Sequence, residues 1–394
     1  METAGYALPV LLLILLVGLV IPELFKKFRL PYVTTLIIFG AILGPYALGL
    51  VEIDDTIRFF GFLGFTFLMF MAGLKTDMDE VKQAKKEVVY MTLLNGAFPF
   101  AIGFLIAYLL GYPLETALVL GVIFISSSVA IILPSVRSSK VFDKRSVNLL
   151  TAAVVLEDAV SLFLLALFFH YFAPMNDLPL WLYFIVLVAS VWALKIILPK
   201  FANLLGSGNR FFSKSDYQNE LRFVIAVLIA VLLFFELLGV HPILAAFLVG
   251  ILLSKNLKSE EIYNKLHVLG YGLFVPVFFF IVGMELDFSV FTELGTAGIA
   301  VFLVVFGLIF SKMLGGYLGG RLAKFPRKDS ALFGMLSTVQ LTTTLAAVYA
   351  GLSLGFLDRT LVTAVILIAV ITTLFVPLIL QFFTKKNEEQ LSDN

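Results

Sequence analysis

Two adjacent acids, Glu157 and Asp158, lie inside a hydrophobic run that extends from Val147 to Phe172. At about 1.5 Å per helical residue this run is long enough to cross a bilayer, and it places the two acids roughly 15–17 Å deep, near the midplane. A charged side chain at that depth costs at least about 2.5–3.5 kcal/mol on insertion scales. A chain that keeps two of them is expected to pair them or to use them, so this pair is the first candidate for a functional site.

The composition agrees with a membrane-spanning chain. Hydrophobic residues make up 60% of the 394 residues, charged residues only 14%, and the mean hydropathy is +1.03. A soluble fold of this length cannot bury so much apolar surface, so we expect an all-α polytopic membrane protein in contact with membrane lipid. The absence of cysteine excludes disulfides and thiolate metal sites.

The sequence contains no pattern typical of an enzyme or a nucleic-acid-binding protein. There is no nucleophile–base constellation, phosphate-binding loop or metal-ligand spacing, so we expect no enzymatic activity and no cofactor. The short basic connectors match the negative charge of the inner leaflet and do not indicate nucleic acid.

The hydrophobic runs predict thirteen transmembrane spans, of which the ninth is short. They cover about residues 6–25, 32–50, 57–74, 88–110, 115–136, 147–172, 180–201, 220–239, 241–254, 266–284, 297–322, 330–352 and 360–383. We therefore expect a single membrane domain over residues 1–384, followed by a short polar cytoplasmic tail at 385–394.

The basic residues alternate across these spans. Of the 28 Lys and Arg residues, 24 fall in the odd-numbered connectors and the tail or at the span ends that adjoin them, whereas the even-numbered side holds Arg58 and Arg359 alone. Cytoplasmic loops carry the excess of Lys and Arg in membrane proteins. The pattern therefore predicts a multi-pass protein of the cell membrane, with the N-terminus outside and the C-terminus in the cytoplasm.

Two short segments recur at an offset of 210 residues. Gly73 to Asp77 matches Gly283 to Asp287, and Ile37 to Gly40 matches Phe247 to Gly250. Seven spans separate the partners, and because seven is odd the two copies must have opposite orientations in the membrane. Chance similarity between apolar stretches is the other explanation, but two matches at one offset favour an inverted repeat with copies at about residues 30–172 and 240–383.

Two corresponding spans carry hydroxyl-rich clusters, which are Ser126 to Ser128 and Ser337 to Thr344. Transporters with inverted repeats place their site where two helices are interrupted at the midplane, and unwound carbonyls and hydroxyls can coordinate a cation there. Helix packing through small hydroxylated residues would give a similar pattern. Both clusters lie roughly 10–20 Å from a helix end, level with the acids, which favours two crossed, broken helices.

Lys312 is the buried cation that could balance one of the acids. It lies roughly 15 Å deep, too far from water to snorkel easily, and we assign it to Glu157. Adjacent helical residues point about 100° apart, so Asp158 can face the cavity between the broken helices. A proton and a monovalent cation would then compete for Asp158, the candidate metal ligand. The other candidate ion- or proton-binding residues are Glu157, Ser127, Ser128, Thr338 and Gln340. Asn95 could contact the site, but such a residue more often hydrogen-bonds a neighbouring helix.

Four segments resemble the monovalent cation:proton antiporters. They are the Glu157-Asp158 pair, Phe310 to Gly316 around Lys312, Glu236 to Gly250, and Pro276 to Asp287. The likeness covers nearly the whole chain. It is strongest to the branch that contains bacterial and archaeal sodium/proton antiporters and the glutathione-gated type of potassium/proton exchangers.

The resemblance implies a homodimer of thirteen-helix subunits that exchanges Na⁺, or else K⁺ or Li⁺, for protons in pH homeostasis. It also implies an elevator movement of a core domain, here about residues 57–172 and 266–352, against a dimerisation domain. Glu157 stands where other members have Asp or an uncharged residue, and an ion-paired acid at this position implies electrogenic exchange. Gln340 replaces a charged residue of many relatives. The nucleotide-binding regulatory domain of many potassium exchangers is not expected here.

Two other classes of transport protein remain open. A sodium-coupled small-solute symporter also has inverted repeats and broken helices, but it should need a roomier and more varied polar pocket. A cation channel of related fold would use the acids as a static selectivity element, although channels favour repeated rings of pore-lining residues. The spacing of residues along the chain does not choose between Na⁺, K⁺ and Li⁺, which differ in coordination distances.

Overall fold

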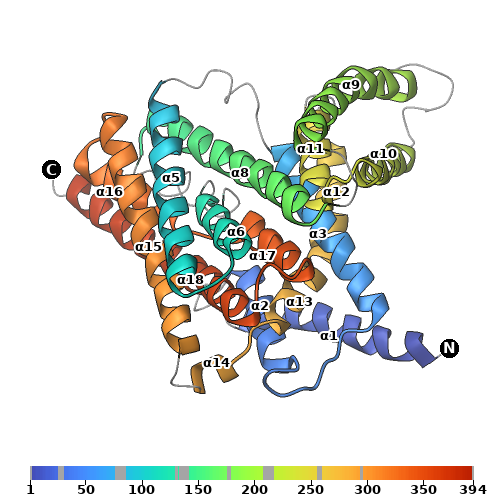
Figure 1. Ribbon diagram of the computed structural model, residues 1–394, viewed down its shortest axis with the longest axis horizontal. Helices are drawn as coiled ribbons and strands as arrows, with labels where there is room; N and C mark the ends of the chain where they lie inside the picture. The colour runs from blue at the N-terminus through green and yellow to red at the C-terminus, as the bar shows by residue number, and fades with distance from the viewer. Residues whose placement is uncertain are drawn as a thin grey trace. The chain divides into compact units, whose positions relative to one another are not determined.

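The computed structural model describes residues 2–24, 31–75, 86–128, 132, 142–174, 179–206, 217–254, 260–292 and 296–392. All regular secondary structure in these ranges is helical (Figure 1). In chain order the helices are α1 (Glu2–Leu24), α2 (Tyr32–Leu43), α3 (Asp55–Lys75), α5 (Lys86–Leu109), α6 (Leu114–Ile125), α8 (Lys144–Phe172), α9 (Leu180–Gly206), α10 (Tyr217–Leu237), α11 (Pro242–Ser254), α12 (Glu260–Leu269), the π-helix η2 (Gly270–Phe274), α13 (Val275–Met284), α14 (Ser289–Thr292), α15 (Thr296–Leu322), α16 (Arg327–Ser337), α17 (Thr342–Ser353) and α18 (Arg359–Ser392).

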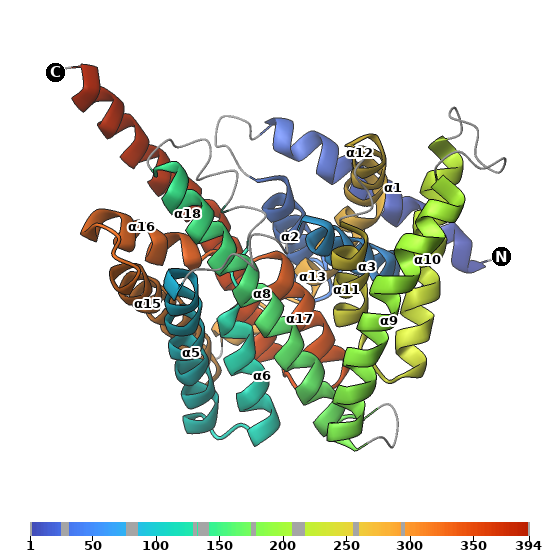
Figure 2. The same ribbon diagram turned by 90° about the horizontal axis from the view of Figure 1, so that it is seen from above.

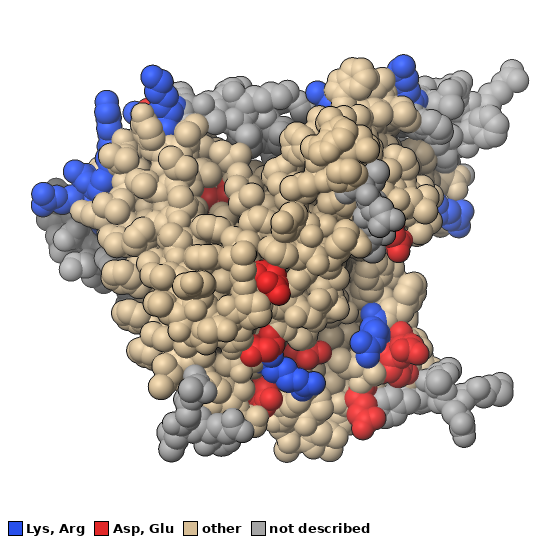
Figure 3. Space-filling model, in the orientation of Figure 1, with Lys and Arg blue, Asp and Glu red and all other residues tan. Residues whose placement is uncertain are grey.

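The helices have the length and composition of membrane spans. Among the described residues, nine helical segments are long and apolar enough to cross a membrane, and three shorter apolar helices accompany them. Most of the surface seen in Figure 3 is formed by residues other than Lys, Arg, Asp and Glu. A helix lies in each span expected from the sequence, so the prediction of an all-α polytopic membrane protein is confirmed.

The chain forms two compact units. The first contains Met1–Arg58, Asp79–Leu164 and Phe279–Asn394, and the second contains Phe59–Met78 and Leu165–Phe278. Within the first unit, α5 packs along α15 and also against α6, and α15 packs against α16 (Figure 2). This unit contains Glu157, Asp158 and Lys312 together with both hydroxyl-rich clusters.

Acidic residues cap the first turn of three helices. The carboxylates of Asp54, Asp143 and Asp358 each accept a hydrogen bond from the backbone N–H three residues later, at 2.7, 2.8 and 2.9 Å. Such caps satisfy N–H groups that have no partner inside the helix. Hydrogen bonds from Ser146 also lower the pKa of Asp143, which lies outside the membrane-spanning helices. These caps fix where α3, α8 and α18 begin.

Four glycines allow pairs of helices to touch through their backbones. A Cβ atom added to any of them would lie 2.1–2.2 Å from a carbonyl oxygen of the facing helix, so no larger residue fits without a shift. The glycine and carbonyl partners are Gly40 with Phe280, Gly283 with Ile37, Gly250 with Phe70, and Gly73 with Phe247.

These contacts recur at the sequence offset of 210. Adding 210 to Gly40 gives Gly250, and subtracting 210 from its partner Phe280 gives Phe70, which is the partner of Gly250. The same arithmetic relates the other two contacts. The glycines that mark the repeat in the sequence are therefore the points of closest approach between α2 and α13 in one unit and between α3 and α11 in the other.

Replacement of Gly283 by alanine should destabilise the protein by about 1–3 kcal/mol, because the new methyl group must push α2 and α13 apart. Gly272 is a matched control, since a Cβ there meets no atom within 4 Å. Thermal unfolding in detergent should show a clear loss for Gly283→Ala and no loss for Gly272→Ala. Equal stability of the two variants would contradict the close packing.

Candidate functional site

Two interruptions in the helices meet inside the first unit. Helix α6 ends at Ile125 and residues 126–128 are irregular, while residues 338–341 separate α16 from α17. The backbone N–H of Ser128 donates to the carbonyl oxygen of Val339 at 2.8 Å. Irregular backbone at the depth of a membrane requires such partners, because no water is present to satisfy it.

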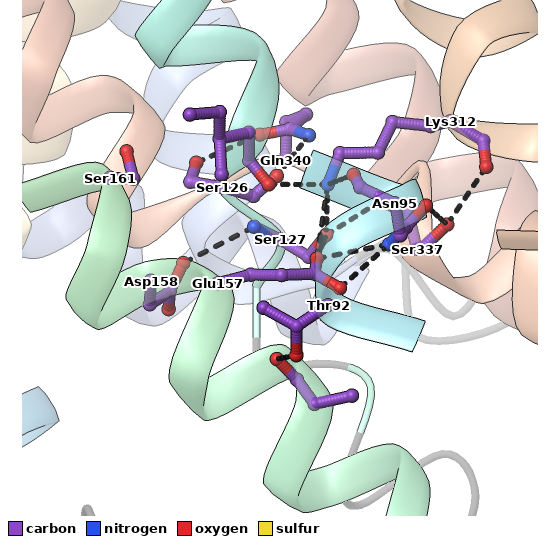
Figure 4. A network of polar contacts seen from close by, with 12 residues as sticks. Thr92, Asn95, Ser126, Ser127, Glu157, Asp158, Ser161, Lys312, Ser337 and Gln340 are labelled. Carbon is purple, nitrogen blue, oxygen red and sulfur yellow. Dashed lines mark hydrogen bonds and ion pairs between the residues drawn. The ribbon is translucent and has the colours of Figure 1, made fainter. Parts of the chain in front are cut away.

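A fully buried ion pair lies beside these interruptions. The Lys312 ammonium on α15 is 3.1 Å from Oε2 of Glu157 on α8, and neither side chain is exposed (Figure 4). Lys312 also donates to the Ser127 hydroxyl at 2.9 Å, to the Asn95 carbonyl at 3.1 Å and, at very short range, to the Ile125 carbonyl. Four oxygen atoms therefore surround this ammonium group.

The sequence explains why both backbone carbonyls are available to Lys312. In a regular helix the carbonyl of Asn95 would accept from the residue four positions later, but that residue is Pro99, which has no N–H. Ile125 is the last residue of α6, where carbonyls lack helical donors. Pro99 and the end of α6 thus leave two carbonyl oxygens without helical donors, and both accept hydrogen bonds from the Lys312 ammonium group.

The carboxylate of Glu157 is also surrounded by donors. The amide nitrogen of Asn95 donates to both of its oxygens at 2.9 Å, and the Ser127 hydroxyl donates to Oε2 at 3.0 Å. A buried ion pair is compatible with a stable fold only when such additional hydrogen bonds offset the loss of hydration. This pair meets that condition.

Asp158 lies outside the ion pair. Its side chain is 7% exposed, and Oδ1 accepts from the backbone N–H of Ser127 at 3.2 Å. The side chain of Thr343 on α17 lies beside the same carboxylate. In Figure 4, Asp158 and Lys312 lie on opposite sides of Ser127. The adjacent acids therefore have different surroundings, one paired with an ammonium group and one bonded by the neutral backbone N–H of Ser127 with Thr343 nearby.

Gln340 and Ser126 tie the two interruptions together. The Gln340 amide nitrogen donates to the Ser126 carbonyl at 2.6 Å, and the Ser126 hydroxyl lies 3.2 Å from the Gln340 oxygen and 2.7 Å from the Thr344 hydroxyl. The backbone N–H of Gln340 donates to Thr372 of α18 at 3.2 Å. The hydrogen bonds of the Gln340 side chain thus join the interruption after α6 to the one between α16 and α17.

The remaining candidate residues differ in their surroundings. Ser127 contacts both acids and Lys312. Ser128 lies beside it, and its buried hydroxyl has no hydrogen-bond partner among the described residues. The Thr338 hydroxyl donates to the Met335 carbonyl at 2.7 Å, within its own helix turn. The structure therefore brings Ser127 to the acids, leaves the Ser128 hydroxyl available and engages Thr338 elsewhere.

Sequence reasoning did not select three residues that the structure places in this network. Asn95 bonds Glu157, the Ser337 hydroxyl lies 3.1 Å from Asn95 Oδ1, and Thr343 lies beside Asp158. Asn95 and Pro99 are four residues apart, which predicts a free carbonyl in the middle of a helix. That spacing was the available signal for Asn95, whereas nothing in the sequence distinguishes Ser337 or Thr343 from their hydroxylated neighbours.

The described residues contain no group of three or more His, Cys, Asp or Glu side chains that could hold a metal ion. A cation bound at this site would rely on one carboxylate and on hydroxyl or carbonyl oxygens, which suit hard monovalent ions.

Replacement of Lys312 by methionine should destabilise the protein by about 3–5 kcal/mol, because it leaves the Glu157 carboxylate buried without its counter-charge. A second change, Glu157→Gln, should restore part of that loss in the double variant. Thermal unfolding of both single variants and the double variant forms a mutant cycle that measures the coupling. Additive effects of the two changes would contradict a paired Glu157 and Lys312.

Comparison with known proteins places this arrangement among membrane exchangers. The family model described as "Sodium/hydrogen exchanger, transmembrane" matches residues 11–386. A probable Na⁺/H⁺ antiporter 3 of Methanocaldococcus jannaschii is 29% identical over 387 residues, which cover 96% of this chain and 98% of that protein. A Na⁺/H⁺ antiporter of Enterococcus hirae is 26% identical over 385 residues, with coverage of 96% and 98%.

Solved structures share the fold. The sodium proton antiporter MjNhaP1 from Methanocaldococcus jannaschii superimposes with a TM-score of 0.71 over 96% of each chain, at 18% sequence identity. At 18% sequence identity, this likeness shows a shared arrangement of helices and nothing further.

Proposed function

This chain belongs to the sodium/hydrogen exchanger family, and on that premise we propose that it is a secondary active antiporter that exchanges a monovalent cation, with Na⁺ favoured, for protons. The observation that carries the proposal is the contrast between the two adjacent acids. Glu157 is held by an ammonium group, whereas Asp158 is a buried carboxylate whose known donors are neutral.

Competition for Asp158 would couple the two ions. A proton and a cation both neutralise the carboxylate, so the binding of one excludes the other. For a cation, the hydroxyl of Ser128 supports the proposal, because it is buried next to Ser127 and has no hydrogen-bond partner in the part of the chain that the structure describes. The Thr343 hydroxyl is a second neutral oxygen beside the carboxylate. Gln340 then acts by joining the interrupted helices, Thr338 by bonding the last turn of α16, and Ser127 by orienting both acids.

Neutralisation of Asp158 would also control the movement. A bare carboxylate costs several kcal/mol to carry past apolar surface, whereas a carboxylate loaded with a proton or a cation does not carry net charge. An elevator-type core of about residues 57–172 and 266–352 would then change sides in its loaded forms. This makes exchange obligatory, and inverted repeats at about residues 30–172 and 240–383 would supply the two related orientations of the site.

The ion pair gives a reason to expect electrogenic exchange. One proton on Asp158 for one Na⁺ moves no net charge. If the Glu157–Lys312 pair also takes up and releases a proton during the cycle, more than one proton moves per cation. Glu157 precedes Asp158 in the chain, and both acids accept hydrogen bonds from Ser127. The ion pair and Asp158 can therefore respond to each other.

The proposal includes the setting of the protein. We place it in the cell membrane as a homodimer, with the N-terminus outside and the C-terminus in the cytoplasm, where it would serve pH homeostasis. The distribution of basic residues supports the orientation. The transported ions are Na⁺, or K⁺ or Li⁺, and H⁺, without a cofactor.

Proton movement in proteoliposomes tests this function. A pH-sensitive dye would report flux after addition of Na⁺, K⁺ or Li⁺, with and without a clamp on the membrane voltage. Asp158→Asn should abolish cation-dependent flux, because asparagine cannot exchange a proton for a cation. Asp143→Asn is the matched control, since asparagine preserves the capping oxygen outside the site.

Each outcome of this assay has a distinct meaning. Flux that depends on Na⁺ and on voltage, and that is lost in Asp158→Asn alone, is the expected result. Flux that ignores voltage would overturn electrogenic exchange while leaving antiport intact. The absence of proton flux with every cation would overturn the antiporter and favour a sodium-coupled symporter, and conductance without coupling would favour a channel.

A further inference from the structure

Asn95 connects four helices around the buried ion pair. It lies in α5 with no exposed surface, and it contacts Glu157 of α8, Ser337 of α16 and Lys312 of α15 (Figure 4). Packing between two helices requires none of this chemistry, because apolar residues would fill the same space. The number of different partners suggests a role in the exchange reaction itself.

The side chain of Asn95 fixes the carboxylate of Glu157. Its amide nitrogen lies 2.9 Å from both carboxylate oxygens. Ser127 and Lys312 bond Oε2, whereas Oε1 faces the Asn95 amide. Because the amide nitrogen is equally close to the two oxygens, one of its hydrogens is shared between them, and this contact sets the plane of the carboxylate.

The other side of the amide faces the second helix interruption. Asn95 Oδ1 lies 3.1 Å from the hydroxyl of Ser337, the last residue of α16, and shares its single hydrogen with the carbonyl oxygens of Gly334 at 2.8 Å and Lys312 at 3.2 Å. The reverse orientation of the amide would place its oxygen against the carboxylate of Glu157, where two acceptors repel each other. The neighbours therefore define the orientation of the amide.

The backbone of Asn95 holds the second member of the pair. Its carbonyl oxygen accepts from the Lys312 ammonium at 3.1 Å. Pro99 keeps this carbonyl free of a helical donor. One residue therefore bonds Glu157 through its side chain and Lys312 through its backbone.

We propose that Asn95, with its carbonyl freed by Pro99, is a positioning residue for the exchange reaction: it holds the Glu157–Lys312 pair in register with the end of α16. The inference rests on the proposed function, because it describes how the ion pair is linked to the moving site. Movement at the end of α16 would be transmitted to the carboxylate of Glu157 through the amide of Asn95, without contact between Asn95 and Asp158.

Two substitutions of Asn95 test the role of its side chain. Asn95→Leu removes the amide, and we expect the maximal exchange rate to fall by about tenfold or more, with a smaller change in the KM for Na⁺ because Asp158 is untouched. Asn95→Asp keeps the shape but adds an acid that faces Glu157 and Lys312, near Asp158. When protonated it can still donate to Glu157, whereas its charged form repels both acids, so exchange should fall more steeply with rising pH than in wild type.

Pro99→Ala tests the role of the backbone. Alanine supplies an N–H to the Asn95 carbonyl, which then competes with Lys312 for that oxygen. Replacing an interior proline by alanine favours the helix, so stability should be kept or raised. A lower maximal rate in a protein that unfolds no earlier than wild type would separate positioning from folding.

Thr92→Val is the matched control for these variants. Thr92 also lies on α5 and bonds α8, through the Ala153 carbonyl at 3.3 Å, but it does not reach the ion pair. All four variants would be compared with wild type for Na⁺-dependent proton flux across a range of pH, and for thermal unfolding in detergent. We expect Thr92→Val to keep the wild-type rate and pH profile.

The outcomes separate this inference from the proposed function. Normal rates and pH profiles in Asn95→Asp and Pro99→Ala, alongside active wild type, would overturn the positioning role alone. Losses in Asn95→Leu that Thr92→Val shares equally would assign Asn95 to helix packing and also overturn it. A wild type without Na⁺-dependent proton flux would instead overturn the function on which the inference rests.

Discussion

A lysine ammonium group buried at the centre of a helical bundle needs acceptors on every side, and the arrangement of the site follows from how Lys312 obtains them. Its four oxygen partners belong to α5, the end of α6, the following irregular segment and α8. Two of them are backbone carbonyls, which a continuous regular helix would not offer. Pro99 and the end of α6 at Ile125 release them. The interruption of the helices is therefore a condition for burying this charge.

The ion pair also explains how two adjacent acids can have different tasks. Successive residues on α8 point about 100° apart, so Glu157 meets Lys312 while Asp158 faces another direction. Ser127 stands between them, with its hydroxyl on Glu157 and its backbone N–H on Asp158. One carboxylate is thereby matched by a cation within the chain. The other is left with neutral donors, which is the chemistry that a site for exchangeable ions requires.

The sequence predicted much of this arrangement through simple physical limits. Long apolar runs require helices, and the depth of Lys312 matches that of Glu157, which lies 3.1 Å away in the structure. The offset of 210 between Gly73 and Gly283 marks backbone contacts whose partners recur at the same offset. The choice among hydroxyl groups was beyond sequence reasoning. Thr338 bonds its own helix turn while Thr343 reaches Asp158, and that difference depends on where α16 stops and α17 begins.

The central claim is that Asp158 exchanges its proton for the cation, while the Glu157–Lys312 pair supplies the further proton of electrogenic exchange. Calorimetric titration of the purified protein with Na⁺, in buffers that differ in heat of ionisation, measures the protons released for each cation bound. The account predicts proton release in wild type, none in Asp158→Asn, and continued release, reduced in number, in Glu157→Gln. Release that persists in Asp158→Asn but disappears in Glu157→Gln would contradict it.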